Sequence, residues 1–215
     1  MFENAVIEKY IEYTEILRKK LDGYFKDQKE FLACRAGCDI CCNSSYYPSS
    51  ALEYEYVRTG INTLLSEEKK QEIYDKVIKI LKDRRNFLKT NPNVMEYSYS
   101  CPFLVDGACG IYQYRPLLCR THGLIYNDIE NENRQKAPHC MKIGLNYANV
   151  YDEKTGKFSL EKVKELGLKS TPKSYDLSYS IVMKESGIKD FGDVRMLFEW
   201  VIMDIPNYEE LIKED

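Results

Sequence analysis

The sequence has no excess of basic residues and no long apolar run. It contains 31 Lys and Arg residues against 34 Asp and Glu residues, which leaves a formal net charge of -3. A chain with this balance offers little electrostatic attraction to phosphates, which argues against a nucleic-acid-binding role. No stretch stays apolar for the roughly 20 residues that a helix needs to cross a bilayer, which argues against a membrane role.

The first ten residues lack the basic start and the apolar block of a secretory signal peptide. We therefore expect a cytoplasmic protein, in a compartment where thiols are kept reduced. There, a set of cysteines points to metal binding or catalysis rather than to disulfides. The chain also lacks internal repeats, low-complexity tracts and a clear linker, so we expect residues 1–215 to form a single domain.

Helical signals dominate the sequence outside the cysteine-rich stretch. Apolar residues recur at spacings of three and four over residues 6–24, which predicts a helix. Ser50 and Glu53 form a capping box that starts a second helix, and we expect this helix to stop at Gly60. Further helices are predicted to begin at Ser66, at Ser159, at Thr171-Pro172 and at Asp193.

These signals predict a mostly α fold of about six helices. Residues 101–145 follow neither the helical nor the strand period and are rich in Cys, Gly, Pro and Arg, so we expect loops with short helical turns there. Residues 150–158 have the pattern of a small hairpin around Glu153 to Gly156. At most this one hairpin is expected.

Eight cysteines form the strongest chemical signal, and they fall into two groups. Thiolates repel one another, so gathering this many is costly unless a cation offsets their charge. We therefore predict that residues 31–140 form a metal-binding region with every cysteine as a candidate ligand. Scattered buried thiols and a disulfide framework are the less favoured alternatives. The candidate ligands are Cys34, Cys38, Cys41, Cys42, Cys101, Cys109, Cys119 and Cys140.

Two kinds of metal centre fit this cysteine pattern. Zinc takes four tetrahedral ligands and commonly uses two separated Cys-x-x-Cys pairs. The unequal spacings and the adjacent pair Cys41 and Cys42 suit an iron–sulfur cluster, whose ligands are gathered from distant segments. We favour a [4Fe–4S]-type cluster and keep Zn²⁺ as the alternative.

The first group also matches another type of iron–sulfur enzyme. Cys34, Cys38 and Cys41 have the Cys-x3-Cys-x2-Cys spacing of radical S-adenosylmethionine enzymes. Ile40, however, stands where those enzymes carry an aromatic residue, and the chain lacks the repeated strand–helix units of their barrel. We rank this interpretation below the other two.

Taken together, several short motifs resemble those of one family. They are Phe31-Leu-Ala-Cys34, Cys38-x-x-Cys41-Cys42, Cys101-Pro-Phe-Leu, Cys109-x-Ile-Tyr112 and Arg115-Pro116-x-x-Cys119-Arg120. This set resembles the YkgJ-type cysteine-cluster proteins, a zinc- or iron-chelating family that includes the cluster region of flagellin lysine N-methylases. The resemblance covers residues 31–122, with Cys140 as a last member, and implies a metal site built from the eight cysteines. Its methylase members add methyl transfer with S-adenosylmethionine as a minority hypothesis.

Charged residues and histidines lie among the cysteines. Arg115 and Arg120 are predicted cofactor-binding residues, since a fixed positive charge could hold thiolates, donate to cluster sulfides or clamp a carboxylate substrate. The structural alternative is a clasp on loop carbonyls. His122 and His139 are the only histidines, and each is a candidate ligand or acid–base group. Asp106 is expected to shape a turn.

Three functions remain open at this point. The first is an iron–sulfur oxidoreductase or group-transfer enzyme, acting on a small molecule or a protein that the sequence does not identify. The second is a zinc-binding structural module without catalysis, and the third is a metal carrier or sensor. The sequence names no catalytic residue and does not indicate an oligomeric state.

Overall fold

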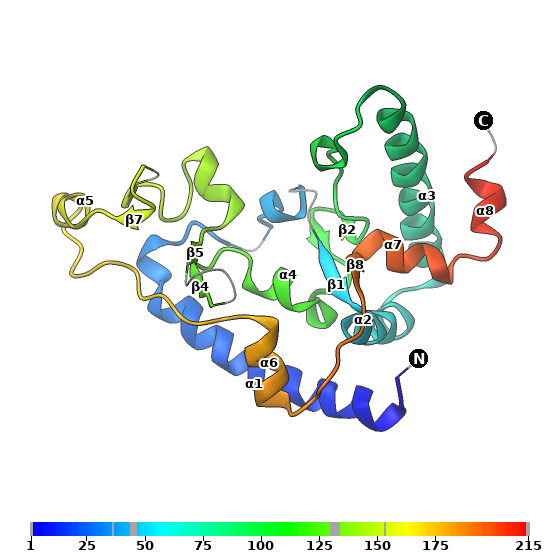
Figure 1. The fold of residues 1–215 in the computed structure, drawn as a ribbon, viewed down its shortest axis with the longest axis horizontal. Coiled ribbons are helices and arrows are strands. Elements are labelled where there is room, and N and C mark those ends of the chain that lie inside the picture. Colours follow the sequence, from blue (N-terminus) through cyan, green and yellow to red (C-terminus); the bar gives the residue numbers. More distant parts are fainter. Residues whose placement is uncertain (1, 36, 44–46, 130–133, 153, 214–215) are drawn as a thin grey trace. The chain divides into compact units, whose positions relative to one another are not determined.

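The computed structural model describes residues 2–35, 37–43, 47–129, 134–152 and 154–213. The chain is mostly helical over these residues (Figure 1), as the sequence predicts. The described ranges contain eight α-helices, three of them with only four or five residues. The helices are α1 (Asn4–Asp27), α2 (Ala51–Leu64), α3 (Glu67–Thr90), α4 (Leu117–Thr121), α5 (Leu160–Glu165), α6 (Tyr179–Ser186), α7 (Leu197–Val201) and α8 (Tyr208–Leu211).

The described strands form four two-stranded antiparallel sheets. Three sheets are local hairpins, and the fourth joins β1 to β8 across most of the chain. The predicted hairpin is β6 with β7; Glu153, in the turn between them, lies outside the described residues. The other pairs were not predicted, because strands of two or three residues are too short to show alternation. The strands are β1 (Pro48–Ser50), β2 (Leu104–Val105), β3 (Ala108–Cys109), β4 (Tyr126–Asp128), β5 (Arg134–Lys136), β6 (Tyr151–Asp152), β7 (Lys157–Phe158) and β8 (Val194–Met196).

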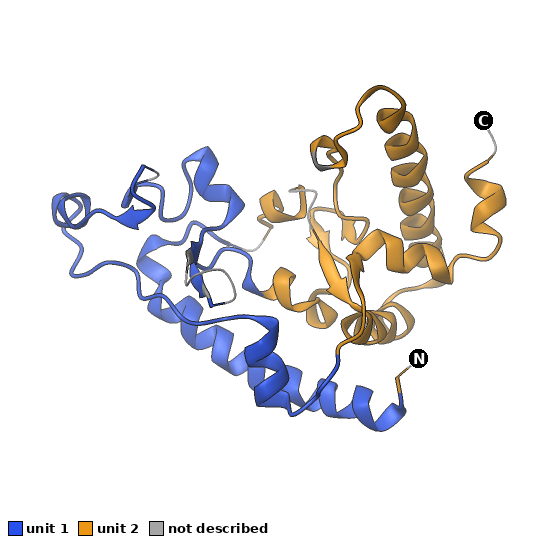
Figure 2. Cartoon of the chain, viewed as in Figure 1, with its two compact units in different colours: residues 1, 3–36, 121–190 blue, residues 2, 37–120, 191–215 orange. Residues whose placement is uncertain are grey.

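The chain divides into two compact units, shown in different colours in Figure 2. Apart from the first two residues, unit 1 comprises residues 3–36 and 121–190, and unit 2 comprises residues 37–120 and 191–215. The predicted metal-binding region, residues 31–140, therefore has residues in both units. That the chain forms one domain stays a prediction.

Unit 1 is built on the long helix α1. The predicted apolar stripe of this helix is buried, and a carboxylate on α6 ties the two helices together. The Tyr13 hydroxyl donates to Glu185 at 2.7 Å, and the Lys20 ammonium lies 2.5 Å from the same side chain. The buried residues of α1 are Tyr10, Tyr13, Thr14, Leu17 and Leu21.

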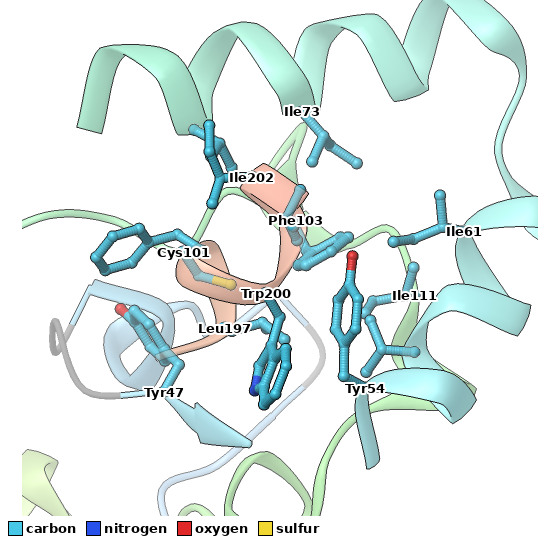
Figure 3. Close-up of a cluster of buried hydrophobic side chains, with 14 of the residues drawn as sticks. Tyr47, Tyr54, Ile61, Ile73, Cys101, Phe103, Ile111, Leu197, Trp200 and Ile202 are labelled. Carbon is cyan, nitrogen blue, oxygen red and sulfur yellow. The ribbon is translucent and has the colours of Figure 1, made fainter. Parts of the chain in front are cut away.

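Unit 2 holds the larger apolar core (Figure 3). Helix α2 begins where the sequence predicts: the Ser50 side chain accepts from the Glu53 amide at 3.3 Å, and the Glu53 carboxylate accepts from the Ser50 amide at 2.8 Å. Side chains from α2, α3 and α7 pack together in this core. They include Tyr54, Val57, Ile61, Ile73, Val77, Phe198, Trp200 and Val201.

One predicted helix end is wrong. Helix α2 does not stop at Gly60 but continues to Leu64. A Cβ atom at Gly60 would lie 2.5 Å from the Cβ and Cγ atoms of Tyr114, closer than side chains can approach. Gly60 is therefore a site of close packing rather than a helix terminator.

Two predicted helix starts also lie too early. The segment after Thr171-Pro172 stays extended because its backbone bonds to Asn127, which donates to the Tyr175 carbonyl and accepts from the Leu177 amide. Helix α6 then begins at Tyr179, after the Ser178 cap. Similarly, residues 194–196 pair with β1, so the helix predicted from Asp193 begins at Leu197. No helix in the described ranges is both long and apolar enough to cross a membrane.

The two helical glycines of α1 and α2 provide a matched stability test. Gly60→Ala is expected to lower the free energy of unfolding by about 1–3 kcal/mol, because the added methyl group overpacks against Tyr114. Gly23→Ala, where nothing lies within 4 Å of the new Cβ, is expected to raise it by about 0.5–1 kcal/mol. Urea unfolding curves measure both; equal effects would contradict the packing assigned to Gly60.

Candidate metal centre

Unit 2 contains six of the eight cysteines. They come from four short elements: a 3₁₀ helix at Ile40–Asn43 with the residues before it, the turn before β2, strand β3 and helix α4. None of these elements has a periodic signal of its own in the sequence. The six cysteines are Cys38, Cys41, Cys42, Cys101, Cys109 and Cys119.

Backbone contacts join the first and second cysteine groups. The Cys101 amide donates to the Cys42 carbonyl at 2.7 Å, and the Tyr47 hydroxyl donates to the same carbonyl. Cys101 is only 8% exposed and belongs to the apolar core of unit 2, in the same close-up as Tyr47 and Trp200 (Figure 3). Its thiol is therefore fixed by the core rather than carried on a loose loop.

The β2–β3 hairpin positions Cys109. Asp106 and Gly107 both have positive φ, 51° and 75°, as the two central residues of a tight type I′ hairpin turn require. Asp106 thus shapes a turn, as predicted. The register pairs Leu104 with Cys109, and the Gly110 amide donates to the Phe103 carbonyl at 2.9 Å. The turn therefore returns the chain so that Cys109 lies opposite the segment that begins at Cys101.

A buried carboxylate places Cys119. Glu53 is fully buried, and beyond the α2 cap its Oε1 atom accepts from the Leu117 amide at 2.6 Å. Leu117 is the first residue of α4, and Cys119 lies two residues later. A carboxylate that accepts backbone donors is favoured at a helix start, so Glu53 stabilises the beginning of both α2 and α4.

The thiols of unit 2 influence one another electrostatically. Burial raises the pKa of Cys119, and the charge of Cys109 raises it further. Burial also raises the pKa of Cys101, with further increases from Cys119, Cys109 and Cys42. For Cys42, burial is again the largest cause, followed by Cys109, and Cys38 adds a smaller increase. Cys42, Cys101, Cys109 and Cys119, which are partly or fully buried, therefore lie within electrostatic reach of one another, and the exposed Cys38 acts on Cys42 alone.

Two of the thiols accept backbone hydrogen bonds from residues two positions later. Against the dominant effect of burial, a hydrogen bond from Phe103 lowers the pKa of Cys101, and one from Ile111 lowers that of Cys109. Amide donors aimed at sulfur stabilise the thiolate form, and hydrogen bonds of this kind tune metal–thiolate centres.

The donor set fits a thiophilic metal. Soft thiolates select zinc, copper(I) and iron–sulfur clusters over hard cations, and the amide donors favour the charged form that a metal needs. In the described residues, no three His, Cys, Asp or Glu side chains already form a closed metal-ion site. Metal binding would therefore have to bring the thiols of unit 2 closer together than they lie in this structure.

Arg115 and Arg120 have different surroundings. Arg115 is half-buried, with its guanidinium carbon 3.6 Å from the centre of the Tyr112 ring. Its charge lowers the pKa of Cys42, Cys109 and Cys119 against the effect of burial. Arg120 is 8% exposed and donates to the carbonyls of Arg115 and Gln113. Cofactor binding by these two residues stays a prediction.

The remaining two cysteines belong to unit 1. The Cys34 sulfur accepts from the Asn146 side-chain amide at 3.4 Å, and Gly123 leaves room for it, since a Cβ atom there would lie 2.6 Å from the sulfur. Cys140 is buried in a 3₁₀ helix at His139–Ile143. Burial raises the pKa of Tyr147, and the charges of both thiols raise it further. The eight cysteines thus divide into six and two, and metal ligation by the pair stays a prediction.

Both histidines also belong to unit 1, with His122 half-buried and His139 exposed. Their predicted roles as ligands or acid–base groups stay predictions. Neither the contact of Asn146 with Cys34 nor the second contact of Glu53 is predicted by the sequence. The capping box did identify Glu53, but its contact with α4 spans 64 residues of sequence and leaves no local pattern. Asn146 has no signal in the sequence at all.

Replacing the Glu53 carboxylate tests its role in placing α4. Glu53→Gln keeps the shape but can turn an amide donor toward the Ser50 and Leu117 amides, so we expect unfolding to become easier by about 1–3 kcal/mol. Glu199→Gln is the matched control, because Glu199 also caps a helix but is one-third exposed. Thermal or urea unfolding measures both, and a larger loss in the control would contradict the assignment.

Comparison with known families gives one match. The family model CxxCxxCC, described as "Putative zinc- or iron-chelating domain", matches residues 33–141. This range contains all eight cysteines and both histidines. Comparison with curated proteins and with solved structures gives no match. The matched range covers half of the chain, and the chain therefore belongs to the CxxCxxCC family of zinc- or iron-chelating domains.

Proposed function

We propose that this protein carries an iron–sulfur cluster on the thiols of unit 2 and uses it in redox or group-transfer chemistry. Family membership supports the binding of zinc or iron, and the choice of an iron–sulfur cluster is our inference from the thiols. Cys42, Cys101, Cys109 and Cys119 would hold the cluster, with Cys38 and Cys41 beside them. When bound, a cluster supplies a one-electron redox centre or a Lewis-acidic iron.

The gathering of thiols from widely separated segments within mutual electrostatic reach carries this proposal. Cys42, Cys101, Cys109 and Cys119 lie within that reach, and Cys41 is adjacent to one of them in sequence. A tetrahedral zinc ion and a [4Fe–4S] cluster both take four cysteines, so the preference for a cluster comes from the unequal spacing of cysteines that are gathered from distant segments. Two backbone hydrogen bonds to sulfur add the kind of tuning that redox centres use.

The protein's own residues have three tasks in this proposal. Glu53 orders the start of α4 and with it Cys119. The apolar core around Cys101 limits water, which lowers the local dielectric and strengthens each charge interaction. The cytoplasm is the compartment that we propose, because reducing conditions keep such thiols available for metal. We assign no residue to S-adenosylmethionine or to methyl transfer.

Metal analysis of protein purified without oxygen tests the proposal. We expect about four iron and four acid-labile sulfide per chain, and a broad absorption band near 400 nm that bleaches with dithionite, as for a [4Fe–4S] centre. One or two zinc ions per chain with no sulfide and no colour would contradict the cluster. That result would favour the zinc-binding structural or metal-handling role instead.

Serine variants test which thiols hold the centre. Cys119→Ser is expected to lose more than half of the bound metal, because it removes a thiol that interacts with three other cysteines of unit 2. Cys34→Ser is the matched control in unit 1 and is expected to retain most of it. Metal per chain measures both. If Cys34→Ser lost as much metal as Cys119→Ser, a centre confined to the thiols of unit 2 would be wrong.

A further inference from the structure

Unit 1 contains a pocket that is lined by its own residues. The volume of the pocket is about 300 Å³, at the lower end of the range of about 300–1,000 Å³ in which proteins bind small molecules. Three segments of unit 1 line it: residues 30–33 after α1, residues between 144 and 150, and the turn after α5 with Leu166 and Leu168. The pocket has the size and the concave form of a small-molecule site.

Packing and hydrogen bonds hold these three segments together. Tyr147 and Val150 line the pocket, are each 1% exposed and belong to an apolar core of unit 1. The Ala33 amide donates to the Asn146 side chain at 2.8 Å, which joins the first segment to the second. The Leu168 amide donates to a carbonyl of α5 at 3.0 Å, which fixes the third. The pocket is therefore formed before any ligand enters it.

Apolar side chains also rise from the buried base of the pocket toward solvent. Leu166 is 51% exposed, and Leu168 and Phe31 are half-buried. The ring of Phe31 is stacked on that of Tyr147, with 6.2 Å between the ring centres. A ligand with an apolar body would cover these side chains and remove their surface from water, which favours binding.

Glu30 gives the pocket a negative charge. It is the one ionisable acid or base among the described lining residues, and within the described part of the chain its carboxylate makes no hydrogen bond and no ion pair. Glu185 of the same unit differs, because its carboxylate lies 2.5 Å from the Lys20 ammonium. The carboxylate of Glu30 thus has no cation from the protein. The adjacent ring of Phe31 adds a second group that attracts cations.

We propose that this pocket binds a small organic ammonium ion, whose apolar body packs against Tyr147, Val150 and Leu166 and whose charged group lies beside Glu30. The inference goes beyond the metal centre and does not depend on it. A neutral ligand of the same shape would keep the apolar contacts and lose the ion pair. An anionic ligand of similar shape would be repelled by Glu30.

A comparison of three matched ligands tests the proposal. Phenethylammonium, phenethyl alcohol and hydrocinnamate have a similar aromatic body and carry a positive, a neutral and a negative group. In NMR titrations of the isotope-labelled full chain, phenethylammonium is expected to shift the amide signals of residues 144–150 until they saturate. It is expected to bind about 2-fold to 5-fold more tightly than phenethyl alcohol, the gain of a solvent-exposed ion pair. Hydrocinnamate is expected to bind most weakly.

Variants at Glu30 test the charge. Glu30→Gln is expected to reduce the affinity for phenethylammonium to that for phenethyl alcohol and to leave the affinity for the alcohol unchanged. Glu161→Gln is the matched control, because Glu161 is also an exposed carboxylate of unit 1 but does not line the pocket. This control is expected to bind all three ligands like the parent.

Variants at Leu166 test the apolar wall. Leu166→Ala is expected to weaken the binding of all three ligands by a similar factor, because it removes apolar contact and no charge. Leu160→Ala is the matched control, since Leu160 is 65% exposed and does not line the pocket. Unfolding curves of the four variants are expected to match the parent, because each change is at an exposed side chain.

Two outcomes would overturn the inference. If none of the three ligands gave saturable shifts around the pocket, the binding site would be wrong, and the proposed metal centre would be untouched. Equal affinities of the parent for phenethylammonium and phenethyl alcohol, or an unchanged affinity for phenethylammonium in Glu30→Gln, would contradict the assignment of an ammonium ligand.

Discussion

Several partly or fully buried thiols of unit 2 lie within electrostatic reach of one another, and the rest of the unit is arranged around that constraint. Burial raises the pKa of Cys42, Cys101, Cys109 and Cys119, and for Cys42, Cys101 and Cys119 the charge of neighbouring cysteines raises it further. Without metal these groups are favoured as neutral thiols. A metal reverses this preference, because it binds the thiolate form and offsets the repulsion. The apolar core and the amide donors around the thiols suit a bound centre better than a set of free thiols.

One buried carboxylate links the helical scaffold to this constraint. Glu53 closes the cap of α2, and the same side chain accepts from the first residue of α4. A buried charge is costly unless its partners are complete, so the position of Cys119 is coupled to the stability of the α2 cap. In the same region, Tyr114 packs against Gly60 of α2. Two contacts with α2, one from Glu53 and one from Gly60, therefore fix the segment that contains Tyr114 and Cys119.

Local signals predicted the helices and the candidate ligands, and long-range packing decided the rest. The Ser50 and Ser66 caps and the apolar stripe of α1 were readable because each depends on residues close in sequence. The sequence wrongly predicts a helix end at Gly60, because the packing that requires a glycine there involves Tyr114, which lies 54 positions away in the sequence. The late start of α6 depends on backbone bonds to Asn127. The cysteine pattern predicted a metal site, but the division of the thiols between two units depends on tertiary contacts that spacing does not encode.

The central claim is that sulfur atoms of this chain hold its metal. X-ray absorption at the K edge of the bound metal, measured on protein as purified, tests it most directly because the first coordination shell reveals the ligand atoms. We predict a shell of sulfur alone, at about 2.3 Å from the metal. A shell dominated by nitrogen or oxygen, at about 2.0–2.2 Å, would contradict a cysteine-held centre.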